Sequence, residues 1–502
     1  MCAALAAAVA VGARAEYRLD YSVEFSANAG SGSFAPYYIM SNNHGRTTQP
    51  FGTWLEARLG RKMEMDKRFS YGFCVDLIGG WGSKTGYMRW NPETSSWFEH
   101  KEGAAPFRIQ QLYGEVKYRC LYLQVGLKEH GSWMLDNSLS SGDLVESANF
   151  RPIPEARIGF VDYQNIPLTK GWVQAHVVLA IGKPTDNDWV RNHYNNYAGV
   201  MNTGWWYCYK HVYLRSNPDK RLCLTLGIQA SAQGAGTCYK YRGGQQVSVT
   251  KEPFKFMTLI DLIIPRVGNN FYNGNHLGSL DAKLRYRMDC GDIAAYFQWP
   301  WEDGSGLAKK NGFDGLWGVE FHPRTIPWLK GVVVEYLDFT NQSGPMHWAP
   351  GDHPGTTIQS QTTGYDNYYN NYQYHSFSYY GMAIGSAFLP SPIYNRDGRL
   401  DFACNRVRGV HLGVEVGELA GFSGRCMFSW RKGWGTGELP YESAVYNTSA
   451  MLEVKYRPAA VPSLSAKASL ALDRGKMLGN NFGAMVTLAW NGDFDIVKLF
   501  KK

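Results

Sequence analysis

Residues 408–416 have the sequence RGVHLGVEV, in which larger apolar side chains occupy every second position. One face of this segment consists of Val410, Leu412, Val414 and Val416. The opposite face consists of Gly409, His411, Gly413 and Glu415. A period of two residues is that of a β-strand, whose successive side chains point to opposite faces. A strand with a charged residue on one face cannot bury both of its faces in a sandwich core.

The same alternation recurs from end to end of the chain. In residues 281–288 (DAKLRYRM), Leu284 and Tyr286 alternate with basic residues. Comparable segments are residues 17–25, 69–77, 112–118, 121–127, 173–181, 222–230, 450–456 and 464–472. Each is about 8–10 residues long, which is closer to a membrane-spanning strand than to an average soluble one. Apolar-out, polar-in alternation of this length, ended by aromatic and turn residues, is typical of a transmembrane β-barrel.

The composition agrees with a large antiparallel barrel. Aromatic residues make up 15% of the 502 residues, and 55 residues are glycine, which suits many aromatic-capped strands and turns. Mean hydropathy is −0.33, and beyond residue 15 no run approaches the roughly 18 apolar residues of a membrane helix.

We therefore predict an all-β fold in which residues 16–502 form one domain. It is a single antiparallel transmembrane β-barrel of about 16–18 strands, 18 being favoured, with lumen-filling loops or short helices. A soluble propeller or β-helix is the competing architecture, but no internal repeat of about 40–50 residues is visible.

The first fifteen residues, MCAALAAAVAVGARA, are small and apolar and end in Ala13-Arg14-Ala15, which is similar to a signal-peptide cleavage site. The basic segment that normally precedes such a run is missing. We therefore interpret residues 1–15 as a partial signal peptide, with the mature protein starting near Glu16. A buried N-terminal helix is the alternative.

Two stretches do not alternate. Residues 252–264 (EPFKFMTLIDLII) have apolar side chains near helical spacing, which predicts an amphipathic helix against the barrel. Residues 135–150 (LDNSLSSGDLVESANF) are polar and rich in turn formers, which favours an inward-folded loop or a short plug helix. An ordinary surface loop is the alternative for both stretches.

Residues 126–160 (GLKEHGSWMLDNSLSSGDLVESANFRPIPEARIGF) resemble the Wzi-like capsule assembly family of outer-membrane proteins. That family has a strand, a glycine turn, and a Ser-containing segment that leads through N-x-R-P-x-P to an Arg before the next strand. The matching residues here are Ser147, Asn149, Arg151, Pro152, Pro154 and Arg157. Similar strings occupy residues 34–45, 295–306, 335–355 and 471–483. One departure is the turn His130-Gly131-Ser132, where distant members have W-G-P-G.

The resemblance implies an outer-membrane barrel of a Gram-negative bacterium that binds capsular polysaccharide as a lectin and helps to attach it to the cell surface. It implies no enzymatic activity and no cofactor. The other partners expected of such a barrel are outer-membrane lipid, including lipopolysaccharide, and the barrel-assembly machinery during insertion. The net charge of +8 is mild and shows no basic block, so a nucleic-acid partner is not expected. A porin or sugar-uptake channel is the alternative function, and a surface hydrolase is a third.

Exposed aromatic residues on long connections are the candidate carbohydrate-binding groups, because rigid amphipathic rings bind at low entropic cost. They lie in QWPWEDGSG (298–306), in the Pro/Gly-rich stretch 339–355, in YDNYYNNYQY (365–374) and in KPTDNDW (183–189). The candidates are Trp301, His347, Trp348, Tyr368, Tyr369, Asp186 and Trp189. Of these, Trp301, Trp348 and Tyr369 are the residues that we expect to be most accessible.

We interpret the charged candidates as structural residues and not as catalytic ones. Glu302 and Asp303 are adjacent, whereas the two carboxyls of a glycosidase lie about 5–10 Å apart across the scissile bond. We therefore expect turn formers or hydrated rim residues at this position. His347, Asp352 and His353 lack the regular spacing of metal ligands, and no metal site is predicted. For the lumenal cations, pairing with carboxylates is favoured over a path for an acidic glycan. These cations are Arg151, Arg157, Lys283, Arg285 and Arg287.

Overall fold

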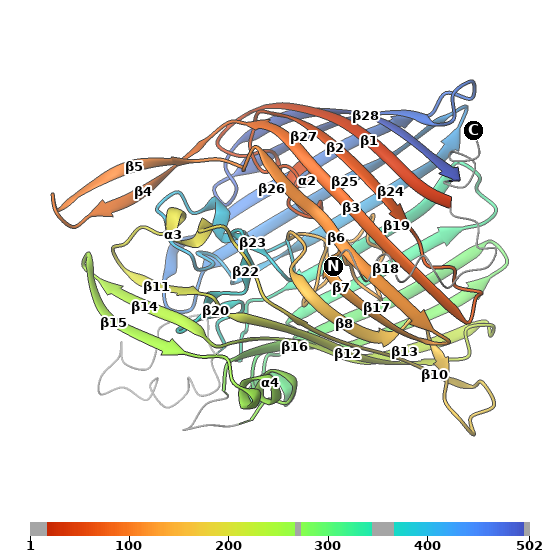
Figure 1. Cartoon of the computed structure of the whole chain (residues 1–502), viewed down its shortest axis with the longest axis horizontal. Coiled ribbons are helices and arrows are strands. Elements are labelled where there is room, and N and C mark those ends of the chain that lie inside the picture. The colour runs from red at the N-terminus through yellow and green to blue at the C-terminus, as the bar shows by residue number, and fades with distance from the viewer. Residues whose placement is uncertain (1–17, 267–272, 344–365, 496–502) are drawn as a thin grey trace.

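The computed structural model describes residues 18–266, 273–343 and 366–495. Its main element is one closed antiparallel barrel of 18 strands (Figure 1). The strands are β1 (Arg18–Ser31), β2 (Gly52–Arg61), β3 (Phe69–Gly82), β6 (Phe107–Tyr118), β7 (Leu121–Leu127), β8 (Pro154–Phe160), β10 (Val173–Gly182), β12 (Trp206–Ser216), β13 (Leu222–Gly234), β16 (Asn275–Met288), β17 (Gly291–Trp301), β18 (Gly315–Pro323), β19 (Leu329–Asp338), β24 (Val407–Leu419), β25 (Phe422–Gly435), β26 (Pro440–Tyr456), β27 (Leu464–Gly475) and β28 (Asn481–Asp495). The predicted fold class and the favoured strand number are confirmed.

The barrel closes between its first and last strands. β1 pairs with β28 along its whole length, from Arg18 opposite Asp495 to Ser31 opposite Phe482, and it pairs with β2 on its other side. Closure leaves the main sheet without an unpaired edge, as a membrane-spanning sheet requires. The two-residue strand β9 (Gln164–Asn165) pairs with β10 beyond the end of β8.

The predicted alternation places apolar side chains outside and polar ones inside. On β24, Leu412 is 38% exposed, whereas His411 next to it is 1% exposed. On β16, Leu284 and Tyr286 are each 44% exposed. A belt of apolar side chains around a closed barrel is the surface that faces lipid in outer-membrane proteins.

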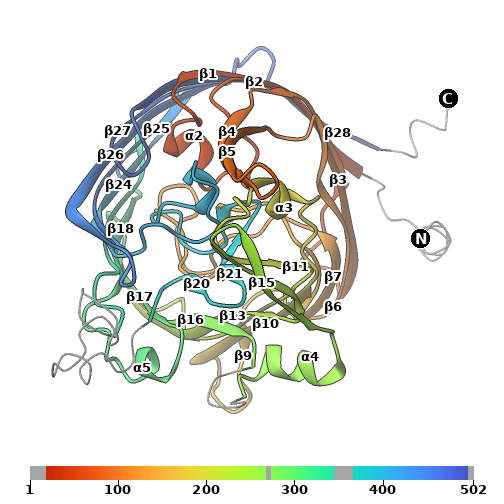
Figure 2. The same ribbon diagram turned by 90° about the vertical axis from the view of Figure 1, so that its left-hand side faces the viewer.

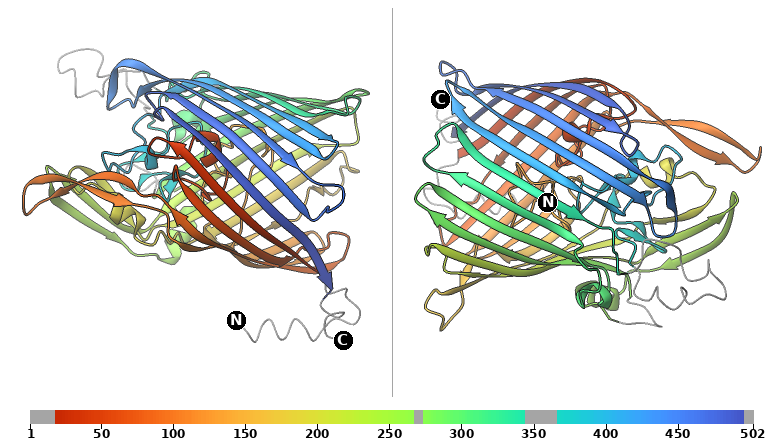
Figure 3. Two further views of the ribbon diagram at one scale, coloured as in Figure 1. Left: turned by 90° about the horizontal axis from the view of Figure 1, so that it is seen from above. Right: turned by 180° about the vertical axis from the view of Figure 1, so that it is seen from behind.

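The two ends of the barrel differ in the length of their connections (Figures 1 and 3). At one end, turns as short as residues 119–120, 289–290 and 420–421 join the strands, and here β1 begins and β28 ends. The opposite end carries the longer segments, such as residues 32–51 and 183–205. Outer-membrane barrels have short periplasmic turns and long extracellular loops, so the end with long segments faces the cell exterior.

The outer segments contain the remaining secondary structure. One hairpin is β4 (Thr85–Asn91) with β5 (Ser96–Glu102), and a small sheet consists of β11 (Gly199–Thr203), β14 (Gly236–Arg242) and β15 (Gln245–Glu252). Two minimal hairpins are β20 (Asn370–Asn371) with β21 (His375–Ser376) and β22 (Ser378–Tyr379) with β23 (Met382–Ala383). The helices are α2 (Tyr37–Met40), α3 (Trp189–His193), α4 (Phe256–Ile263), α5 (Gly304–Leu307) and the 3₁₀ turn η3 (Pro392–Tyr394). None of the helices in the described ranges is long and apolar enough to cross a membrane.

Segments that enter from the outer end fill the lumen, as Figure 2 shows in a view along the barrel. Residues 128–153 run past inward-facing polar side chains. His411 Nε2 lies 2.7 Å from Leu139 O, Gln298 Oε1 accepts from Leu144 N at 3.1 Å, and Glu335 accepts from Ser140 Oγ at 2.6 Å. Apolar residues of this segment and of residues 366–406 form a shared core inside the barrel, including Leu139, Leu144, Phe377, Ile384, Phe388 and Phe402. The inward-folded loop predicted for residues 135–150 is confirmed, and it forms no helix.

The amphipathic helix predicted within residues 252–264 is α4, and it lies against the outside of the barrel (Figures 2 and 3). Leu262 packs on Cys208 of β12 and Ala232 of β13. Lys210 Nζ donates a 2.8 Å hydrogen bond to Leu262 O, which satisfies one carbonyl at the end of the helix. The helix therefore covers a short stretch of the outer surface near the extracellular rim.

The apolar belt yields a test of which strand face contacts lipid. Leu412 lies near the middle of β24, and Leu419 ends the same strand with 68% of its surface exposed. We expect Leu412→Arg to lower the free energy of unfolding in lipid bilayers by about 2–4 kcal/mol, and Leu419→Arg by about 0–1 kcal/mol. Urea unfolding, followed by heat-modifiable gel mobility, measures both. Equal losses for the two variants would show that Leu412 does not face the hydrocarbon.

Candidate functional site

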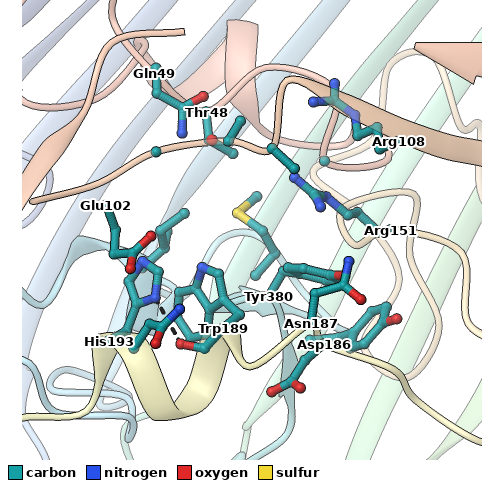
Figure 4. Close-up of a pocket in the computed structure, with 18 of the residues that line it drawn as sticks. Thr48, Gln49, Glu102, Arg108, Arg151, Asp186, Asn187, Trp189, His193 and Tyr380 are labelled. Carbon is teal, nitrogen blue, oxygen red and sulfur yellow. Dashed lines mark hydrogen bonds between the residues drawn. The ribbon is translucent and has the colours of Figure 1, made fainter. Parts of the chain in front are cut away.

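A cavity of about 520 Å³ opens at the extracellular end, above the segments that fill the lumen. This volume is within the usual range of small-ligand sites, about 300–1,000 Å³. Its walls come from five stretches of the sequence: residues 34–49, 85–110, 127–152, 185–193 and 379–393. Figure 4 shows that their side chains converge on one space.

Helix α3 supplies one wall of the cavity. The Asp186 carboxylate accepts a hydrogen bond from Val190 N at 3.1 Å and thereby anchors the start of this short helix. Trp189 and His193, one turn apart, stack with their ring centroids 3.8 Å apart and their planes 18° apart. His193 Nδ1 lies 2.8 Å from Trp189 O and donates to that carbonyl. The stack holds the indole ring at the cavity wall. A helix as short as α3 is not stable by itself, so it depends on such packing.

His193 is uncharged at neutral pH. Burial lowers the pKa of its imidazole from the ordinary value of about 6.5 to about 3. Its ring is 5% exposed and packs edge-on against Tyr87, with the centroids 4.6 Å apart. His193 therefore contributes shape and a ring surface to the cavity, and no positive charge.

Tyr380 and Arg151 form the neighbouring wall (Figure 4). The Tyr380 hydroxyl donates to Thr185 O at 3.1 Å, which ties residues 379–393 to the segment before α3. The Arg151 guanidinium lies over the Tyr380 ring, 4.2 Å from its centroid. A cation on an aromatic face is held in place by the quadrupole of the ring.

The opposite wall is polar. It carries Thr48 and Gln49, with Glu102 near His193 (Figure 4). Flat aromatic and apolar surfaces combined with a few hydroxyl, amide and charged groups are the usual chemistry of a ligand pocket. Sugars present both apolar C–H faces and hydroxyl groups, and this combination matches both.

Among the predicted carbohydrate-binding residues, Asp186 and Trp189 line the cavity. His347 and Trp348 lie outside the described residues. The predicted accessibility of Trp301 and Tyr369 is wrong, because each is only 6% exposed, and the candidate Tyr368 is 2% exposed.

The three buried aromatic residues have structural partners. Trp301 ends β17 and its ring lies against Gly278 in the neighbouring strand, where even a Cβ would clash with it. The Tyr368 hydroxyl donates to Asp314 at 3.0 Å, and the Tyr369 hydroxyl donates to Leu144 O at 2.5 Å. The stretch 366–374 therefore folds into the barrel, although its composition predicts an exposed loop.

The acidic pair after Trp301 has a similar structural role. Glu302 Oε1 accepts from Tyr369 N at 2.6 Å, and Asp303 Oδ1 accepts from Ser305 N at 2.6 Å at the start of α5. Asp303 is thus the predicted turn former. Glu302 is a buried hydrogen-bond acceptor for residues 366–374 and not the predicted hydrated rim residue. Burial raises the pKa of its carboxyl well above the usual range.

The residues that carry the family resemblance hold the lumenal segments together. Ser147 Oγ donates to Gly385 O at 2.7 Å, and Asn149 Nδ2 donates to Ala383 O at 3.0 Å. Arg157, which is 1% exposed, pairs with Glu146 at 2.5 Å and with Glu155 at 2.7 Å. Pro152 is buried beside the cavity, and Pro154 begins β8.

The pairing expected of the lumenal cations is present for most of them. Besides Arg157, Lys283 pairs with Glu320 at 2.6 Å and Arg287 lies 3.7 Å from Asp292. Arg285 donates to Pro218 O at 2.5 Å. Within the described ranges, neither Arg285 nor Arg151 has a carboxylate within 4.0 Å, and the Arg151 guanidinium lies over the Tyr380 ring.

Arg108, Gln49 and Tyr380 also line the cavity, and no sequence pattern marks them as binding residues. Nothing in the sequence separates Tyr380 from the other members of a set of 32 tyrosines. Arg108 stands at an inward position of β6, and only the fold shows that this position borders the cavity.

Comparison with solved structures gives a match over nearly the whole chain. One matching protein is Wzi of Escherichia coli, described as an outer membrane protein involved in group 1 capsule assembly and as a carbohydrate-binding β-barrel. The TM-score is 0.55 at 14% identity, and the match covers 94% of this chain and 84% of Wzi. The chain has the barrel fold of Wzi. The predicted resemblance is thereby confirmed at the level of the fold, and the barrel is of the Gram-negative outer-membrane class, as predicted.

Two other solved structures are less similar to this chain. OccK5 (OpdH) of Pseudomonas aeruginosa has a TM-score of 0.45 at 9% identity, with 96% of this chain and 100% of that chain covered. OccAB2 of Acinetobacter baumannii has a TM-score of 0.45 at 10% identity, with 95% and 98% covered. Neither the known protein-family models nor the curated protein sequences give a match to this chain.

The lowered pKa of His193 predicts a pH dependence for α3. The folded state holds the imidazole neutral, so the unfolded segment binds more protons below about pH 6.5, and the local stability of α3 falls as the pH drops from there towards 3. In protein with ¹³C-labelled histidine, the resonance that is missing from His193→Gln should not titrate between pH 8 and 5. A midpoint near 6.5 would mean that the imidazole is solvated.

Proposed function

We propose that this protein is a non-enzymatic outer-membrane lectin that binds capsular polysaccharide and helps to attach it to the cell surface. The observation that carries the proposal is the outward-facing cavity between α3 and residues 379–393, where Trp189 and Tyr380 stand among amide, hydroxyl and charged groups. The cavity lies at the extracellular end, where a surface polymer is available. The likeness of fold to Wzi, a carbohydrate-binding barrel, supports the same proposal.

The filled lumen favours a binding protein over the alternative, a porin or sugar-uptake channel. Leu139, Leu144 and Phe388 are fully or almost fully buried inside the barrel, and the segments that carry them bond to several strands. A channel needs a continuous aqueous path past such segments. The hydrogen bonds that hold residues 128–153 to β17, β19 and β24 oppose the opening of that path.

Conductance separates the two functions. We expect the purified protein to insert into planar bilayers without large, steady openings, because packed side chains occupy the lumen. Insertion of the same protein preparation is verified independently by protease protection in lipid vesicles. Large steady openings that a soluble sugar blocks would favour the uptake channel.

Binding tests the stacking role of Trp189. We expect Trp189→Ala to weaken binding of capsular polysaccharide, purified from the strain that carries the gene, by about 1–3 kcal/mol, as for an aromatic hot spot. Trp189→Phe retains a ring and should retain part of the affinity. Trp172→Ala is the matched control, because Trp172 is 59% exposed and lies at the opposite, periplasmic end.

Titration calorimetry gives the affinities, and heat-modifiable mobility shows that each variant is folded. In cells, the Trp189→Ala variant should release polymer into the medium while total polymer stays constant. Unchanged affinity in folded Trp189→Ala, together with normally attached polymer, contradicts the proposed site.

A further inference from the structure

Among the described residues, two arginines that line the cavity have no carboxylate within 4.0 Å, whereas the lumenal Arg46 and Arg157 both pair with glutamates. Arg46 forms ion pairs with Glu56 at 2.9 Å and Glu129 at 2.5 Å. Arg157 pairs with two glutamates. Within the part of the chain that the structure describes, neither Arg108 nor Arg151 has a carboxylate within 4.0 Å, although both line the cavity.

Arg151 extends its guanidinium into the cavity above Tyr380 (Figure 4). The segment that carries it is fixed on both sides. Pro152 follows it, and Asn149 Nδ2 before it donates to Ala383 O at 3.0 Å. Burial lowers the pKa of Arg151, which shows a cation removed from water without a compensating anion. The site therefore has a rigidly placed positive charge before any ligand arrives.

Arg108 lies where this cavity meets a second, smaller one inside the lumen. It is 8% exposed and stacks over Trp54, 4.6 Å from the ring centroid. Its Nη2 donates to Arg46 O, whereas its Nε and Nη1 are buried and have no acceptor among the described residues. Buried donors without acceptors are costly, and a guanidinium edge of this kind suits a planar anion.

The negative groups of the cavity lie elsewhere. In Figure 4, Glu102 stands on the far side from Arg151, near His193, and the Asp186 carboxylate already accepts from Val190 N. Charge in the cavity is thus separated, with cations at one side and an acid at the other. A sugar that carries one anionic substituent would bind with a defined orientation.

We propose that Arg151, with Arg108 beside it, forms a subsite for the carboxylate of an acidic sugar, such as a hexuronic acid residue within a polysaccharide. The proposal rests on the carbohydrate-binding function above and specifies the class of sugar. The carboxylate accepts from the guanidinium groups, while the sugar ring packs on Tyr380 or Trp189. A phosphate substituent on a glycan shares the negative charge and is separated from a carboxylate by the test.

The test uses the full mature chain in detergent at low ionic strength, with D-glucuronate, D-galacturonate, D-glucose, D-galactose and glucose 6-phosphate as probes in titration calorimetry. We expect at least one uronate to bind more tightly than its neutral parent sugar and than the phosphate. Arg151→Gln should weaken uronate binding about tenfold or more, because hydrogen bonds to charged groups are the strong ones. Arg151→Lys keeps the charge without the fork and should lie in between.

Arg191→Gln is the matched control. Arg191 lies on α3, close to the cavity but not lining it, so this variant removes the same charge without touching the subsite. Arg108→Gln serves as a second variant if Arg151→Gln loses its heat-modifiable mobility. Equal binding of uronates and neutral sugars, no binding of either uronate, tighter binding of the phosphate, or the same loss in Arg191→Gln each overturns the subsite.

The two sets of variants distinguish a failure of the carboxylate subsite from a failure of the proposed lectin function. If Trp189→Ala weakens polysaccharide binding while Arg151→Gln leaves uronate binding unchanged, the subsite is wrong and the lectin function stands. Uronates could instead bind through Arg151 while the purified protein does not bind the polysaccharide and cells with Trp189→Ala do not release it. In that case the cavity is an anion site and the lectin function is wrong.

Discussion

Every backbone N–H and C=O group in the hydrocarbon region needs a partner within the protein, because lipid offers none. In this chain the sheet meets that requirement by closing on itself between β1 and β28. Closure in turn fixes the direction of all side chains, since a period of two leaves one face for lipid and one for the lumen. The polar lumen, the apolar belt and the grouping of long segments at one end all depend on this single constraint.

The inward face then determines how the lumen is filled. It presents His411, Gln298 and Glu335, groups that would otherwise need water, and residues 128–153 provide backbone partners for them. Ion pairs such as Arg157 with Glu146 neutralise charge where both side chains are buried. An apolar core between residues 128–153 and 366–406 joins the two segments into one body. The barrel therefore supports a rigid platform below its outer opening.

The cavity is a property of that platform. Its walls come from segments whose ends are fixed by different strands, and short contacts such as the one between Tyr380 and Thr185 hold the walls together. A short helix such as α3 is marginal by itself and depends on tertiary packing, here the stack of Trp189 on His193. Binding groups that are positioned before the ligand arrives lose less entropy on binding. The proposed affinity for a polysaccharide depends on this rigidity.

The amino-acid sequence by itself determined the class of the fold, because alternation is local and repeats in every strand. It also predicted α4 and the inward course of residues 135–150. Of its carbohydrate-binding candidates, Asp186 and Trp189 line the cavity, and so do Arg151 and Pro152 of the family motif. It could not tell an exposed aromatic loop from a lumenal one. Tyr368 and Tyr369 have the same composition around them as a binding loop, yet the fold buries them against Asp314 and Leu144. Equally, that no carboxylate of the described residues lies near Arg151 and Arg108 is a relation between distant segments. Only the tertiary structure decides which charges are neutralised and which face a cavity, because such pairs lie far apart in the chain and meet only when the barrel has closed.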